Sequence, residues 1–132
     1  MILNLEHVGI VVNKIDQTLP IYTQTLGLKL KTIKEAKHNH IKAAILTTGN
    51  MTIELIEPLD KESPIAKFLN KRGQGIHHLA FTVDNIEQTL QQLKNQGITL
   101  IDEKPRSGIE GGKIAFIHPK STADVLIELC ER

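Results

Sequence analysis

A seven-residue stretch that occurs twice constrains the fold of this chain more than any other feature. The first copy, HVGIVVN, spans 7–13, and the second, HLAFTVD, spans 78–84. Both begin with histidine, carry a small residue third and valine sixth, and end in Asn or Asp. Such self-similarity is typical of chains built from repeated supersecondary units. We therefore expect His78 to be the counterpart of His7.

The repetition continues beyond these stretches. In the first half, alternating apolar residues predict a strand, then a helix over 15–26 with Asp16 as its cap and Gly27 as its stop. Pro20 is expected near the first turn of that helix. Three further strands follow, the last of them MTIELIEP at 51–58.

The second half repeats this order. A strand over 76–83 precedes a helix that is capped by Asp84 and ended by Gly97. Each half is thus a βαβββ unit, expected to be a four-stranded antiparallel sheet with one helix and one uncovered face. The three strands expected to close the second half are ITLIDEK at 98–104, GKIAFIHP at 112–119 and DVLIELCER at 124–132.

A short helix is predicted between the halves, with Ser63 as N-cap, Pro64 at the first helical position and Gly73 beyond the end. The predicted class is α+β, with the two paired βαβββ modules forming a concave sheet around a metal site. The chain is expected to be one domain over 1–132. Within it we place module 1 at about 3–58, the linker helix at about 63–72 and module 2 at about 76–131.

Composition excludes several classes of protein. Sixteen Lys and Arg against fifteen Asp and Glu leave a net charge of +1, and four aromatic residues offer few stacking platforms for bases, so nucleic acid is not an expected partner. The first residues have no basic region and no long apolar run, which predicts neither a signal peptide nor a membrane span. The single cysteine, Cys130, forms no internal disulfide. A cytoplasmic protein is expected.

Four chemically active residues recur in symmetric pairs: His7 with Glu54, and His78 with Glu128. Each taken alone is better explained as a core histidine or as a glutamate on the wet side of an edge strand. Together they favour a metal site, because a carboxylate on an interior sheet face is costly unless it is paired or binds a metal. Two imidazoles and two carboxylates suit Co, Ni, Zn or Mn, and open coordination positions indicate catalysis. His77 points to the other face and receives no role.

The paired units with these four residues resemble the vicinal oxygen chelate superfamily. The stretches IELIEPL, ESPIAKFLNKRGQGIHHLAF and IAFIHPKS are similar to methylmalonyl-CoA epimerases. The resemblance implies one divalent ion held by His7, Glu54, His78 and Glu128, an acyl-CoA thioester as substrate, and a homodimer. It also implies epimerisation at the α-carbon through an enolate, with Glu128 as one acid/base group.

The second acid/base group is where the chain departs from its relatives. Similar epimerases usually carry a glutamate just before the strand KAAIL, and His38 falls at that place here. Histidine titrates near neutrality, so His38 is predicted to take the role. Glu35 and Glu110 are the alternatives, and His38 is equally well explained as a solvated loop residue.

Two further departures lie near the expected mouth of the pocket. Ala123 and Asp124 stand where the family often has two glycines, and Glu110 and Gly111 stand where it has a His-Gly pair. Two other functions therefore stay open. One is a glyoxalase I-like isomerase of a hemithioacetal, and the other is a non-catalytic small-molecule-binding module of the bleomycin-resistance kind.

Overall fold

The computed structural model describes residues 1–132, which divide into two compact units. The N-terminal unit comprises His7–His77. The C-terminal unit comprises His78–Arg132 together with Met1–Glu6. Strand β1 (Ile2–Val11) therefore starts in the C-terminal unit and ends in the N-terminal unit.

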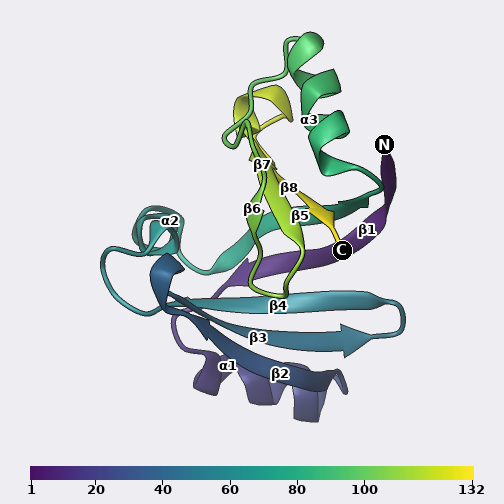
Figure 1. The fold of residues 1–132 in the computed structure, drawn as a ribbon. Coiled ribbons are helices and arrows are strands. Elements are labelled where there is room, and N and C mark those ends of the chain that lie inside the picture. Colours follow the sequence, from purple (N-terminus) through teal and green to yellow (C-terminus); the bar gives the residue numbers. More distant parts are fainter. The chain divides into compact units, whose positions relative to one another are not determined.

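The N-terminal unit pairs its strands in the order β2-β3-β4-β1 (Figure 1). Strands β2, β3 and β4 form an antiparallel meander, whereas β1 and β4 run parallel. The elements after β1 are α1 (Ile15–Pro20), a π-helical turn η1 (Ile21–Thr25), β2 (Lys29–Ala36), a 3-10 turn η2 (Lys37–Asn39), β3 (Ile41–Thr48), β4 (Met51–Pro58) and α2 (Pro64–Arg72).

The C-terminal unit repeats this plan in the order β1-β5-β8-β7-β6, to which β1 contributes its first residues. Here β5 and β8 run parallel, and β8, β7 and β6 are antiparallel. The elements are β5 (Gly75–Val83, whose first residues belong to the other unit), α3 (Ile86–Asn95), β6 (Arg106–Ser107), β7 (Lys113–Ile117), the 3-10 turn η3 (Pro119–Ser121) and β8 (Leu126–Glu131).

The predicted α+β class with two βαβββ modules is confirmed. The expectation of wholly antiparallel units is wrong, because the first and last strands of each module pair in parallel. The helix that follows the first strand joins it to the second strand, which runs parallel to it at the far edge of the unit's sheet, and parallel strands cannot be joined by a tight hairpin.

The strand predicted at ITLIDEK does not form. Only an isolated bridge joins Leu100 to Ile117. The Asp102 carboxylate then accepts a hydrogen bond of 2.9 Å from the Phe116 amide, in the position of a ladder partner. Pro105, which has no amide hydrogen, follows, so regular pairing resumes only at β6.

The first helix differs from its prediction in its N-cap residue and in the position of Pro20. Lys14, not Asp16, is the N-cap, and no side chain caps the helix. Pro20 is the last residue of α1 and does not lie near its first turn. Because Pro20 has no amide hydrogen to continue the α-helical ladder, the chain widens into the π turn η1, where the Leu26 amide donates to the Ile21 carbonyl at 2.9 Å.

The N-caps of the other two helices also differ in detail from those predicted. Asn85, not Asp84, caps α3, and its side chain accepts a hydrogen bond from the Gln88 amide at 3.0 Å. The Asp84 carboxylate instead accepts from the N-terminal ammonium of Met1 at 2.7 Å. Helix α2 begins at Pro64 after Ser63, as predicted, although the Ser63 hydroxyl makes no capping bond.

Each unit has its own apolar core. In the C-terminal unit, α3 packs on β5, β7 and β8 through Ile86, Leu90 and Leu129. In the N-terminal unit, α1 packs on β3 and β4 through Ile15, Leu46 and Leu55, and a smaller cluster lies under α2.

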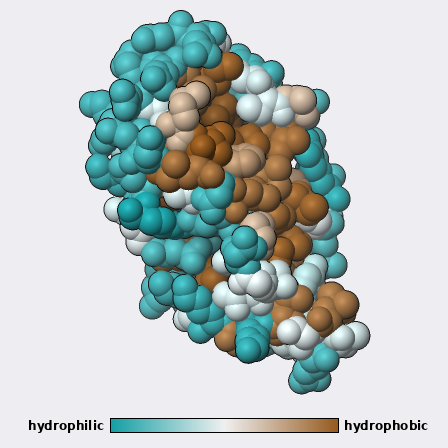
Figure 2. Space-filling model, turned by 90° about the vertical axis from the view of Figure 1, so that its right-hand side faces the viewer, coloured by the Kyte–Doolittle hydropathy of each residue, from teal (hydrophilic) through white to brown (hydrophobic).

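Some large apolar side chains stay exposed, among them Ile2 and Leu3 of β1, and Figure 2 shows hydrophobic surface on the face it presents. The predicted homodimer stays a prediction.

No helix of this chain has both the length and the apolar character that a membrane span requires.

The turn that carries His38 is tied to the loop before α2. His40, in the left-handed conformation at φ 56°, places Nδ1 2.8 Å from Asp60 Oδ2 and Nε2 3.9 Å from Glu62 Oε2. The His40 carbonyl also accepts a hydrogen bond from the Leu59 amide at 2.9 Å. The hydrogen bond that the Asp60 carboxylate accepts from His40 raises the pKa of His40 and lowers that of Asp60.

Two leucines that face each other on neighbouring strands provide a matched test of the N-terminal core. Leu46 of β3 is fully buried, while its register partner Leu30 of β2 is 42% exposed. We expect Leu46→Ala to lower the free energy of unfolding by about 2–5 kcal/mol, because it leaves a cavity, and Leu30→Ala by under about 1 kcal/mol. Urea denaturation measures both. Equal losses would contradict the described core.

The His40 contact predicts a pH dependence with a defined sign. Because the pKa of His40 is raised above 6.5 and that of Asp60 is lowered below 3.8, the pair stabilises the fold fully between pH 3.8 and 6.5. This stabilisation is lost as the pH rises through the raised value of His40. Asp60→Asn is expected to lower the His40 pKa in an NMR titration, and Glu62→Gln to lower it less. A His40 pKa that does not move in Asp60→Asn would contradict the contact.

Candidate metal centre

The N-terminal unit brings His7 and Glu54 together. The imidazole Nε2 of His7, on β1, lies 3.6 Å from Oε2 of Glu54, on β4. His7 is 1% exposed and Glu54 is 5% exposed, so both groups are removed from water.

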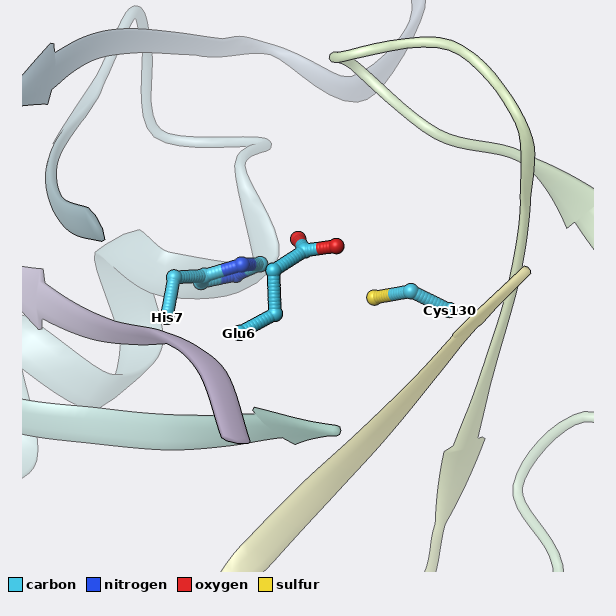
Figure 3. Close-up of side chains that lie close together, drawn as sticks. All are labelled: Glu6, His7 and Cys130. Atoms are coloured by element: carbon cyan, nitrogen blue, oxygen red, sulfur yellow. The ribbon is translucent and has the colours of Figure 1, made fainter. Parts of the chain in front are cut away.

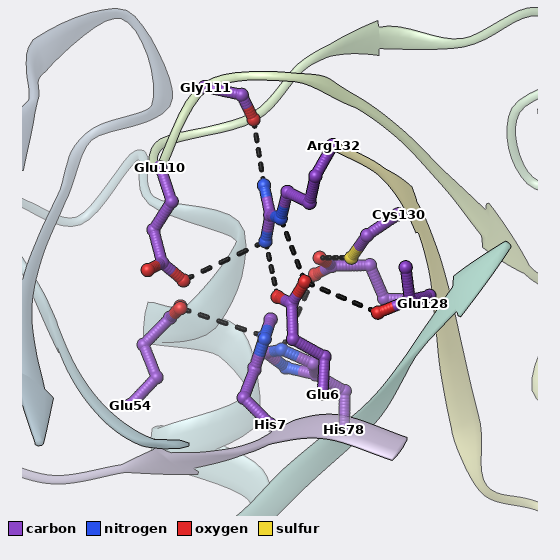
Figure 4. Close-up of polar contacts among 10 residues, drawn as sticks. Glu6, His7, Glu54, His78, Glu110, Gly111, Glu128, Cys130 and Arg132 are labelled. Carbon is purple, nitrogen blue, oxygen red and sulfur yellow. Dashed lines mark hydrogen bonds and ion pairs between the residues drawn. The ribbon is translucent and has the colours of Figure 1, made fainter. Parts of the chain in front are cut away.

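The C-terminal unit builds the same pair from the second copy of the repeat. Nε2 of His78, on β5, lies 3.4 Å from Oε1 of Glu128, on β8, and both residues are buried. The ring of Phe116 meets the His78 ring edge-on at 6.0 Å between centroids and fixes its orientation. Figure 4 shows both pairs with their polar contacts.

The register of the parallel strands explains why each glutamate meets its histidine. His7 lies opposite Thr52, and Glu54 is two residues further along β4. His78 lies opposite Leu126, and Glu128 is again two residues further along β8. A step of two residues returns to the same face of a strand, so the paired side chains share one face in both units.

The small third residue of the repeat has a structural reason in the same register. Gly9 lies directly opposite Glu54, and Ala80 directly opposite Glu128. A larger side chain at either position would occupy the face on which the carboxylate lies. The small third residue of each repeat therefore marks the position opposite each glutamate.

The chemistry of the two pairs fits a divalent ion. Separations of 3.6 and 3.4 Å exceed the 2.7–3.2 Å of an ordinary N–H···O hydrogen bond. Two donors that bind one ion at about 2.1 Å with a tetrahedral angle lie roughly 3.4 Å apart. Imidazole nitrogen and carboxylate oxygen are ligands that Zn, Co, Ni and Mn accept. Each pair is thus suited to supply two ligands.

The second oxygen of Glu128 is held by Cys130, for which no role at the site was predicted. The Cys130 thiol donates to Glu128 Oε2 at 3.0 Å. Burial, together with the Glu128 carboxylate, raises the pKa of this thiol, so it stays protonated and able to donate. Cys130 is two residues from Glu128 on β8, and that spacing was the signal for a contact on the same face.

An ion-pair network continues from Cys130. A Glu6 carboxylate oxygen lies within 4.8 Å of Cys130 Sγ, and Figure 3 shows that the two groups point toward each other. The Arg132 guanidinium binds both Glu6 oxygens, with Nε at 2.8 Å from one of them. Thr82 Oγ1 donates to the same carboxylate at 3.5 Å. These residues of the C-terminal unit were missed, because Glu6 and Arg132 are 126 positions apart.

His77, which was given no role, packs within the N-terminal unit. Its ring meets the Phe68 ring edge-on at 4.9 Å, on α2 of the N-terminal unit. Burial, with a smaller effect of the Arg72 charge, lowers the pKa of His77 to about 4. A neutral imidazole packed on an aromatic ring acts as a structural residue.

The three candidates for a second acid/base group lie in different surroundings. His38, on η2, and Glu35, at the end of β2, are both exposed. Glu110 belongs to the C-terminal unit, where its side chain is 18% exposed and its Oε2 lies 3.8 Å from Nη2 of Arg132.

The two residues that replace the family's glycines keep a glycine-like backbone. Ala123 has φ 56° and Asp124 has φ 66°, both in the left-handed region. The Asp124 amide donates to the Pro119 carbonyl at 2.9 Å, which closes the turn before β8. The local fold is retained at a cost in backbone strain.

Comparisons with known proteins agree with this architecture. A model of the Glyoxalase/Bleomycin resistance protein/Dioxygenase superfamily matches residues 6–116. The uncharacterized protein YqjC of Bacillus subtilis (strain 168) is 42% identical over 127 residues, which cover 96% of this chain and 91% of that protein.

Solved structures of methylmalonyl-CoA epimerases are also similar. The enzyme from Mycobacterium tuberculosis is 39% identical with a TM-score of 0.93, covering 98% of this chain and 88% of that chain. A methylmalonyl-CoA epimerase in complex with methylmalonyl-CoA and NH4+ is 28% identical with a TM-score of 0.93, covering 99% and 95%. This chain belongs to the Glyoxalase/Bleomycin resistance protein/Dioxygenase superfamily.

Proposed function

We propose that this protein is a divalent-metal-dependent epimerase that acts at the α-carbon of a methylmalonyl-CoA-like thioester. The observation that carries the proposal is the buried His-Glu pair that recurs, in the same register, in both units. The similarity to methylmalonyl-CoA epimerases supports the substrate class.

The proposed site holds one ion through all four residues of the two pairs, His7, Glu54, His78 and Glu128. Burial supports this assignment, since two carboxylates at 5% and 6% exposure need a compensating positive charge. When bound, the ion would act as a Lewis acid toward the thioester oxygen.

The protein's own residues move the proton. Inverting the α-carbon requires that one group remove a proton from one face and another return a proton to the opposite face. We assign Glu128 to one face. Its Oε2 accepts a hydrogen bond from the Cys130 thiol, and its Oε1 lies 3.4 Å from Nε2 of His78.

His38 is assigned to the opposite face. Its exposure on η2 lets it exchange protons with water. The ties from His40 to Asp60 and from Leu59 to the His40 carbonyl hold the end of this turn. Glu35 and Glu110 are the alternatives for this role.

Metal dependence and hydrogen exchange test the reaction together. Metal-free protein is incubated with methylmalonyl-CoA in deuterated water, with and without added Co²⁺, and deuterium at the α-carbon is followed by mass spectrometry. We expect rapid exchange only with the metal. Metal binding without exchange would contradict the substrate assignment, and turnover of methylglyoxal plus a thiol would then indicate the glyoxalase-like isomerase. A protein that binds no divalent ion would favour the small-molecule-binding module.

Two variants test the acid/base assignments, each with a control of the same residue type. Glu128→Ala is expected to lower kcat for exchange by at least about 100-fold and His38→Ala by about 100-fold, because each removes a proton-transfer group. The controls are Glu131→Ala, further along β8, and His118→Ala, before η3, which are expected to change kcat by less than about threefold. Unchanged kcat in His38→Ala would return the role to Glu35 or Glu110.

A further inference from the structure

The glycine-containing loop between β6 and β7 is attached to the end of β8. Two hydrogen bonds shape the loop, from the Gly108 amide to the Gly112 carbonyl at 3.3 Å and from the Gly111 amide to the Gly108 carbonyl at 3.1 Å. Between these glycines stands Glu110, one of the three candidates for the second acid/base group. The contacts that hold the loop therefore determine the position of Glu110.

Arg132 makes the attachment through every nitrogen of its guanidinium. Nη1 donates to the Gly111 carbonyl at 2.7 Å, and Nη2 lies 3.8 Å from Glu110 Oε2. Nε and Nη2 bind the two Glu6 oxygens in a fork, which fixes the plane of the group. The Arg132 side chain is 31% exposed and that of Glu6 is 20% exposed, so water weakens these contacts less than it weakens a surface ion pair.

Close backbone packing provides a second, independent sign that the loop is docked. A Cβ on Gly112 would lie 2.5 Å from the Glu131 carbonyl oxygen, and φ at Gly112 is +69°. A Cβ on Gly111 would meet nothing within 4 Å, although φ there is +87°. Only Gly112 is thus required by contact with β8.

The Glu6 carboxylate that anchors Arg132 lies near the hydrogen-bonded pair of Cys130 and Glu128. One Glu6 oxygen is within 4.8 Å of Cys130 Sγ, and the Cys130 thiol donates to Glu128 Oε2 at 3.0 Å (Figure 4). Because Arg132 binds both Glu6 and the Gly111 carbonyl, it sets the position of the loop relative to Glu6.

We infer that Arg132 is a positioning residue, which docks the loop Gly108–Gly112 on the end of β8 and holds Glu110 in place for the reaction. The Glu6 carboxylate acts as the fixed anchor of Arg132. The loop's docking is independent of the reaction, whereas the part played by Glu110 rests on the proposed function.

Amide hydrogen exchange of the metal-free protein tests the docking. Arg132→Gln keeps hydrogen-bonding capacity but loses the charge and the fork. We expect it to raise the exchange rates of the Gly108 and Gly111 amides by at least about tenfold while the amides of α3 stay unchanged. Lys94→Gln, which removes an exposed ion pair of 2.6 Å with Glu103 in the same unit, is the charge-matched control and is expected to leave the loop unchanged. Unchanged loop exchange in Arg132→Gln would overturn the inference.

A pair of glycine variants tests the same docking with Arg132 intact. Both Gly112→Ala and Gly111→Ala place a side chain in the left-handed region, but only Gly112→Ala meets the backbone of β8. We expect faster loop exchange in Gly112→Ala than in Gly111→Ala. Equal rates would contradict docking against β8, and the comparison stands even where Arg132→Gln fails to fold.

Kinetics of deuterium exchange into the substrate test the role of Glu110. If Glu110 takes the second acid/base role in place of His38, Glu110→Gln and Arg132→Gln are each expected to lower kcat by about tenfold, and the double variant by no more than either single one, because both act through the same carboxylate. Additive losses would overturn the positioning role. If the unaltered protein with saturating Co²⁺ shows no exchange into the substrate, the proposed function fails, and the amide-exchange results decide the docking by themselves.

Discussion

Two carboxylates buried inside a sheet are the constraint on which the rest of this structure depends. Each sits beside an imidazole because the first and last strands of a module pair in parallel with the same offset. Glu54 lies opposite Gly9 and Glu128 opposite Ala80, so each glutamate has a small residue as its register partner. The helical crossover, the parallel pairing and the small third residue of the repeat all serve this one arrangement.

The order of elements in each module and the pairing of each histidine with a glutamate were predicted, because both follow from local or repeated sequence patterns. His7 and His78 open matching stretches, and Glu54 and Glu128 follow at similar distances along the chain. Parallel pairing was not predicted, since strand direction depends on how four strands are ordered, and alternation of apolar residues carries no such information. The lost strand at 98–104 was equally hidden, because there a side chain, that of Asp102, takes a backbone partner's position.

The polar contacts around Glu128 were not predicted from sequence patterns, for a different reason. Arg132 meets Glu6 across 126 positions, and no periodicity signals a contact of that range. Cys130 was within reach, since two residues separate it from Glu128 on one strand face. Ala123 and Asp124 show the converse case, in which the backbone keeps a left-handed turn after the expected glycines have been replaced.

The proposed function requires that the two His-Glu pairs together bind one metal ion. Native mass spectrometry of the protein with Co²⁺ tests this requirement most directly, by counting ions per chain in the unaltered protein and in His7→Ala and His78→Ala, with His118→Ala as control. We expect one ion per chain in the unaltered protein and the control, and a loss of binding in either single variant. Two ions per unaltered chain, or one ion retained at full affinity when either histidine is removed, would contradict it.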